Sequence, residues 1–146
     1  MNRFFKRHGI GTYDIENLTE ETKNLKAFIE TSMSTYNLDK GQVIGLGFSN
    51  GANILESLLQ LHGAVLNKIV LLSPVLLQPN VAFKDLTGVD IFIATSDKDP
   101  YVKNKENDTL IKMLKYAPAN VYVHKHDHGH QISQMVLEDL KNWLNT

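Results

Sequence analysis

The chain of 146 residues contains no cysteine, and its charges nearly cancel, with 15 Lys and Arg against 16 Asp and Glu. Without cysteine, disulfide bonds and thiolate chemistry are excluded. A net charge of -1 gives no electrostatic reason to expect nucleic acid or an anionic membrane as a partner. No apolar run is long enough to cross a bilayer or to form a signal peptide, so the expected location is the cytoplasm.

What the sequence does contain is 42% hydrophobic residues in alternating strand and helix patterns. Continuous apolar runs predict buried strands at 43–47, 68–72, 89–94 and 120–124. Apolar stripes at helical spacing predict helices at 18–37, 54–61, 110–117 and 136–144. This alternation predicts an α/β protein of three layers, with helices on both sides of a mostly parallel sheet. Thr19 is the expected N-cap of the first helix, and residues 1–17 are expected to be a loop in which Phe4 and Phe5 dock on the rest of the protein.

The clearest local pattern is a short apolar strand that ends abruptly in a G-x-S-x-G sequence, from Gly47 to Gly51. A helical pattern follows directly, and this combination is typical of a nucleophile elbow. Because Gly47 and Gly51 lack a Cβ, the strand end and the helix start can approach closely around Ser49. The Asn50 amide at the helix N-terminus would then supply one donor for an oxyanion. The alternative interpretation is an ordinary strand-to-helix turn that contains a serine.

Two loops that follow later strands carry side chains suited to activating a serine. One loop contains Asp97 and Asp99, and the other contains His126, His128 and His130. Such loops leave the carboxyl ends of parallel strands, where ligands bind in open sheets. A neutral imidazole can take the serine proton, and a fixed carboxylate can stabilise the imidazolium that forms. The chain order of serine, acid and histidine is that of an α/β-hydrolase triad.

The same residues permit two other interpretations. An Asp before Pro, such as Asp99, commonly serves only turn formation. Four histidines alternate along the segment, at His124, His126, His128 and His130. In an extended segment alternate side chains share one face, as a zinc site requires, although a carboxylate ligand would have to come from Asp127 or elsewhere. A metal-binding domain is therefore an alternative hypothesis, while His124 and His126 are expected at the surface.

Three stretches, at 45–52, 96–102 and 129–132, carry a family resemblance. Together they resemble the phospholipase/carboxylesterase family of the α/β-hydrolase superfamily, which includes acyl-protein thioesterase-like enzymes. In that family the acid immediately precedes the proline of a G-x-x-D-P-x-V stretch, which implies Asp99 rather than Asp97. The catalytic histidine follows a glycine before the last helix, which implies His130. The resemblance thus implies a serine hydrolase of small-molecule esters or thioesters with Ser49 as nucleophile, and it requires no cofactor and no metal.

Two departures from the family pattern accompany the resemblance. Ser96 stands where the family usually has glycine. Family members also carry several strands before the point where this sequence begins, including a His-Gly loop that supplies a second oxyanion donor. Residues 1–146 are therefore expected to form a single α/β-hydrolase domain that is the C-terminal portion of the family's domain, N-terminally truncated. Losing one oxyanion donor should cost about 3 kcal/mol of transition-state stabilisation.

Truncation has further consequences for assembly and activity. The elbow strand would become a long apolar sheet edge, which predicts a homo-oligomer built across that edge or a marginally stable protein. An alternative function is a catalytically weak or inactive α/β-hydrolase-like domain that serves binding or assembly. Most of the apolar residues in 73–88 are expected to pack against the sheet, and some are expected to line a substrate pocket. Such a pocket would suit lipid, acyl-protein and small xenobiotic esters alike.

Overall fold

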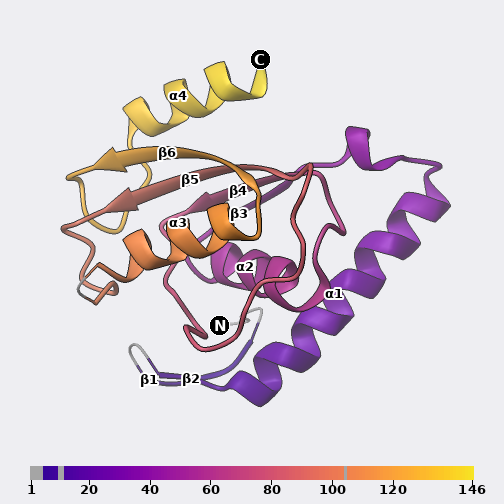
Figure 1. Cartoon of the computed structure of the whole chain (residues 1–146), viewed down its shortest axis with the longest axis horizontal. Helices are drawn as coiled ribbons and strands as arrows, with labels where there is room; N and C mark the ends of the chain where they lie inside the picture. Colours follow the sequence, from indigo (N-terminus) through magenta and orange to yellow (C-terminus); the bar gives the residue numbers. More distant parts are fainter. Residues whose placement is uncertain (1–4, 10–11, 104) are drawn as a thin grey trace.

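The computed structural model describes residues 5–9, 12–103 and 105–146, in which a parallel four-stranded sheet lies between two layers of helices (Figure 1). In spatial order the strands are β3 (Gly45–Phe48), β4 (Lys68–Leu72), β5 (Asp90–Ser96) and β6 (Asn120–His126). The helices are α1 (Ile15–Thr35), α2 (Asn50–His62), α3 (Glu106–Tyr116) and α4 (Gln134–Leu144), with a 3₁₀ turn η1 (Lys40–Gln42). The predicted α/β class is confirmed. Within the described ranges, none of the helices combines the length and apolarity needed for a membrane span.

Alternate residues of the central strands point to opposite faces of the sheet and build two separate cores. On one face α2 and α3 cover fully buried side chains of β4 and β5, namely Ile69, Leu71, Ile91 and Ile93. On the other face α4 covers the alternate positions, namely Val70, Leu72, Phe92 and Ala94. The long helix α1 lies on the outer side of α2 (Figure 1). Burial on both faces explains why these strands read as continuous apolar runs in the sequence.

The parallel register brings the carboxyl ends of the strands to one edge of the sheet. Across this edge the paired residues are Phe48 with Leu72, Leu72 with Ala94, and Ala94 with His124. The loops that follow β3, β5 and β6 therefore begin close together, although they are far apart in the sequence. This edge is where ligands bind in open parallel sheets.

The N-terminal residues differ from the predicted loop. β1 (Arg7–Gly9) and β2 (Thr12–Tyr13) form an antiparallel pair, and α1 already begins at Ile15. These strands are too short to show a recognisable alternation of apolar and polar residues. Phe5 is 2% exposed and packs with Leu18, so its predicted docking is confirmed, whereas Phe4 lies outside the described residues.

The prediction of Thr19 as the N-cap of α1 is wrong. Asp14 occupies the cap position with an extended backbone, and its carboxylate accepts from the Asn17 amide at 2.9 Å. Thr19 lies inside the helix, where its hydroxyl donates to the Ile15 carbonyl at 2.8 Å. An N-cap needs the extended backbone that Asp14 has, and a residue inside the helix such as Thr19 lacks it.

β3 lies at one edge of the sheet, and in the described part of the chain it pairs only with β4. Its side chains Leu46 and Phe48 are 57% and 38% exposed, and Ile44, directly before the strand, is 47% exposed. The prediction of a buried strand is therefore wrong for this face. The physical reason is that α4 packs over β4 and β5 and does not reach these side chains.

The cap assignment makes a testable prediction. Asp14→Ala should lower the free energy of unfolding by about 1 kcal/mol, because one amide at the start of α1 loses its acceptor. Thr19→Ala is the matched control and should not lower stability, since alanine is the better helix former inside a helix. Urea denaturation followed by circular dichroism measures both changes. A larger loss in the Thr19 variant would contradict the assignment.

Candidate active site

The turn between β3 and α2 holds Ser49 in a backbone conformation that residues other than glycine rarely adopt. Its φ is 56° and its ψ is -116°. The Ser49 amide donates to the Leu72 carbonyl at 2.9 Å, and the Ser49 carbonyl accepts from the Asn53 amide at 2.9 Å. Neighbouring β4 and the first turn of α2 thus hold the strained residue from both sides. Strain of this kind persists only where the surroundings enforce it, and it is concentrated at functional sites.

Gly47 permits the sharpness of this turn. A Cβ at position 47 would lie 2.2 Å from the Gly51 carbonyl carbon and 2.5 Å from the Ala52 nitrogen. Both contacts are with backbone, which cannot swing aside as a flexible side chain can. Glycine at position 47 therefore allows the strand end and the helix start to touch, and Gly51 supplies the backbone on the other side of the contact.

Ser49, His130 and Asp99 lie in hydrogen-bonding sequence at the carboxyl edge of the sheet. Ser49 Oγ is 2.9 Å from His130 Nε2, and His130 Nδ1 is 2.8 Å from Asp99 Oδ2. The network assigns the tautomer: with the Nδ1 proton donated to the carboxylate, the Nε2 lone pair faces the serine hydroxyl. Of the histidines considered from the sequence, the structure brings His130 to the serine.

Asp99 is held in a fixed orientation by its surroundings. Its side chain is 1% exposed, and Oδ1 accepts from the Tyr101 amide at 2.9 Å while Oδ2 faces His130. Asp97, two residues earlier, is exposed to solvent. A buried carboxylate with both oxygens bonded is suited to orienting an imidazole and stabilising its charge.

Two aromatic rings contact the His130 imidazole, and no sequence pattern predicted a role for either. The ring centroids of Phe48 and Tyr101 lie 5.2 Å and 4.6 Å from that of His130. Aromatic rings this close restrict the orientation of the imidazole. The available signal was position alone, since Phe48 precedes Ser49 and Tyr101 follows the acid-proline pair.

The other histidines of the row take part in different contacts. His124 is not a surface residue as predicted: its side chain is 14% exposed, and Nδ1 lies 2.6 Å from Asp139 Oδ2 of α4. This hydrogen bond lowers the pKa of Asp139, and burial lowers the pKa of His126.

Among the residues that the structure describes, no group of three or more His, Cys, Asp or Glu side chains is placed to hold a metal ion. The metal hypothesis gains no support from this geometry.

Polar side chains on one face of α2 fix the connection that follows β4. Asn53 Oδ1 accepts from the Val75 amide at 2.9 Å. Glu56 Oε1 accepts from the Leu77 amide at 3.2 Å. Gln60 Nε2 donates to two carbonyl groups of the same connection at 2.6 Å and 3.0 Å. The helix that begins at the serine turn therefore also holds the neighbouring loop in place.

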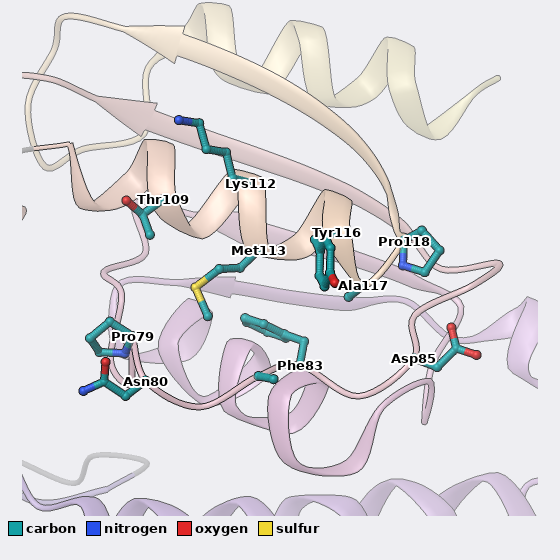
Figure 2. A pocket seen from close by; sticks show the side chains of 11 residues that line it. Pro79, Asn80, Phe83, Asp85, Thr109, Lys112, Met113, Tyr116, Ala117 and Pro118 are labelled. Atoms are coloured by element: carbon teal, nitrogen blue, oxygen red, sulfur yellow. The ribbon is translucent and has the colours of Figure 1, made fainter.

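A cavity of about 740 Å³ lies between this connection and α3 (Figure 2). Phe83 and Met113 project toward one another across it, and Pro79 and Tyr116 contribute to its walls. None of the candidate catalytic side chains lines it. Other apolar residues of the connection, Val75, Leu76 and Leu86, are buried in the protein. These three residues serve packing, as expected for the connection, whereas Phe83 lines the cavity.

The parallel sheet, the strained serine turn and the acid and histidine loops at one edge define an α/β-hydrolase architecture. The family model described as Phospholipase/Carboxylesterase matches residues 8–146. The chain is 35% identical over 143 residues to the putative hydrolase MhqD of Bacillus subtilis (strain 168), covering 98% of this chain and 72% of that protein.

Solved structures agree with this family match. The Bacillus cereus carboxylesterase has a TM-score of 0.92 at 34% identity, covering 98% of this chain and 68% of that one. A carboxylesterase from Mesorhizobium loti has a TM-score of 0.89 at 26% identity, covering 98% and 68% respectively. The chain belongs to the phospholipase/carboxylesterase family, and it has the fold of a carboxylesterase-type α/β-hydrolase. The family predicted from the sequence is thereby confirmed.

The buried Glu56 predicts an unusual pH dependence of stability. Glu56 is 0% exposed, and burial raises the pKa of its carboxyl group well above the ordinary value of 4.5. The folded protein therefore keeps this proton to higher pH than the unfolded chain does. Its contribution to stability is complete below about pH 4.5 and is lost as the pH rises through the folded-state pKa.

Glu56→Gln should remove this loss, because the amide retains an acceptor for the Leu77 amide and cannot ionise. Relative to the variant, the wild-type free energy of unfolding should fall by up to about 1.4 kcal/mol per pH unit above the ordinary pKa. Urea titrations at several pH values measure the difference. Glu20→Gln, on the exposed face of α1, is the control and should follow the wild type. Parallel curves for the wild type and Glu56→Gln would contradict the prediction.

Proposed function

We propose that this chain hydrolyses carboxylic esters or thioesters with Ser49 as nucleophile, His130 as general base and acid, and Asp99 as the orienting carboxylate. The observation that carries the proposal is the pair of hydrogen bonds, at 2.9 Å and 2.8 Å, that joins hydroxyl, imidazole and carboxylate in sequence. The family supports it, since the relatives include carboxylesterases. The substrate is a small-molecule ester or thioester, and the reaction needs no cofactor.

In the acylation step, Ser49 Oγ attacks the carbonyl carbon while its proton passes to His130 Nε2. The imidazolium that forms is stabilised by Asp99, which lies against Nδ1. The carbonyl oxygen becomes an oxyanion and accepts a hydrogen bond from the Asn50 amide at the start of α2. His130 then gives its proton to the leaving alcohol or thiol as the bond to the acyl carbon breaks.

In the deacylation step, water repeats this sequence. His130 takes a proton from the water, whose oxygen attacks the acyl carbon of the Ser49 ester. The second tetrahedral intermediate collapses, the carboxylic acid leaves, and Ser49 regains its proton from His130.

Covalent labelling tests the proposed nucleophile. A fluorophosphonate probe should label the wild-type protein, and labelling should vanish in Ser49→Ala because no hydroxyl remains to attack phosphorus. Hydrolysis of a short p-nitrophenyl ester should be lost in the same variant. Asp99→Asn should lower the labelling rate by roughly 10⁴-fold, since the imidazole then adopts the wrong tautomer.

Ser34→Ala, at an exposed position on α1, is the matched serine control and should label like the wild type. Circular dichroism establishes that each variant is folded. A folded wild-type protein that is neither labelled nor hydrolytic would overturn the proposal, and it would favour the binding or assembly domain instead.

We further propose that two copies of the chain pair through β3. Two observations support this: β3 has a free edge within the described sheet, and its side chains Leu46 and Phe48 are 57% and 38% exposed. An exposed apolar edge strand is a template for pairing with another chain. Pairing with a second copy would satisfy the free backbone groups of β3 and cover its apolar face.

Light scattering coupled to size exclusion tests this pairing. As the protein concentration increases, the measured mass of the wild type should rise toward that of a dimer. The Leu46→Lys variant should keep the mass of a monomer, because a charged edge disfavours pairing. Phe28→Lys is the control, since Phe28 is also an exposed apolar residue, 68% exposed, but lies on α1. A wild-type protein that stays monomeric at all concentrations would refute the proposal.

A further inference from the structure

Ser96 joins the loop that carries the candidate acid to the loop that carries the candidate base. It is the last residue of β5 and is 3% exposed. Its Oγ accepts from the Lys98 amide at 3.2 Å and from the Gly129 amide at 3.1 Å. The first partner lies in the turn before Asp99, and the second directly precedes His130 in the sequence.

A local turn accounts for only one of these two hydrogen bonds. Serine hydroxyls commonly accept from an amide two residues later, as Ser96 does from Lys98. The bond to Gly129 spans 33 positions and connects the end of β5 to the loop that follows β6. A local turn does not require it, so it holds the histidine loop against the acid loop.

The backbone around this bond points to the same role. The Ser96 carbonyl accepts from the Asp99 amide at 3.1 Å, so Ser96 also contacts the acid directly. Gly129 has a φ of 73°, a conformation that favours glycine, and a Cβ there would lie 3.5 Å from the Lys98 carbonyl oxygen. The chain thus turns sharply beside Ser96 immediately before it presents the imidazole of His130.

We propose that Ser96 is a positioning residue that sets the distance between Asp99 and His130 through its bond to the Gly129 amide. The inference rests on the proposed hydrolase function. This role would explain why a serine hydroxyl is present at position 96, where the family resemblance implies glycine. Without that hydroxyl, the Gly129 amide loses its acceptor and the imidazole loses a fixed place between the carboxylate and Ser49.

Kinetics of Ser96→Ala test the effect on catalysis. We expect kcat for ester hydrolysis and the rate of fluorophosphonate labelling to fall about tenfold, because small displacements of catalytic groups are costly. KM should change by less than about twofold, since Ser96 is buried behind the acid loop and acts through other groups. Unchanged rates in the folded variant would overturn the proposal.

Ser57→Ala is the matched control. Ser57 is also buried, 1% exposed, and its hydroxyl is hydrogen-bonded to that of Thr22 at 2.8 Å between α2 and α1. This variant loses a buried serine hydrogen bond away from the candidate site, so its kcat should equal that of the wild type. A loss of kcat equal to that of Ser96→Ala would show that lowered stability, rather than positioning, explains the result.

Hydrogen exchange at the Gly129 amide tests the bond without any activity. In the wild type this amide should be protected, and in Ser96→Ala it should exchange at least about tenfold faster. An unprotected wild-type amide would overturn the proposal even if the variant failed to fold. A wild type that neither labels nor hydrolyses would refute the hydrolase function instead, while protection of Gly129 would still report on the contact between the loops.

Discussion

The close backbone contact between the end of β3 and the start of α2 is the constraint on which the candidate site depends. At Gly47 any Cβ would collide with the Gly51 carbonyl group. Because glycine lets the two elements touch, the chain reverses within a few residues and holds Ser49 at a positive φ. The serine hydroxyl is then presented at the carboxyl edge of the sheet, where the parallel register also delivers the loops that carry Asp99 and His130.

The strain in this turn is balanced by ordinary packing nearby. The Leu72 carbonyl of β4 accepts a hydrogen bond from the Ser49 amide, and α2 is buried along most of its length. The same helix holds the connection after β4 through Asn53 and Glu56, at the cost of a carboxyl group buried with one oxygen unpartnered among the described residues. A site that needs an unfavourable backbone conformation is thus built where a buried helix and a neighbouring strand hold it on both sides, as the enforcement of strain requires.

Agreement between sequence and structure was best where one physical effect dominated. Burial on both faces makes β4 and β5 continuous apolar runs, so both strands were found close to their true bounds. The pair β1 and β2 was missed because two or three residues show no periodicity. The spacing of glycines around Ser49 predicted the turn, but charge and chain order left Asp97 and Asp99 equivalent, and only the family resemblance separated them. For side-chain contacts such as Tyr101 with His130, the only signal was the position of Tyr101 after the acid-proline pair.

By itself, the sequence determined the alternation of strands and helices and the serine turn, because both depend on spacing between near neighbours. Only the tertiary structure decided which distant groups meet: Ser49 with His130 across 81 positions, Ser96 with Gly129 across 33, and His124 with Asp139 across 15. These contacts follow from strand register and from the angle at which each loop leaves the sheet. Neither quantity is encoded in the local pattern, since each is the outcome of packing both faces of the sheet at once.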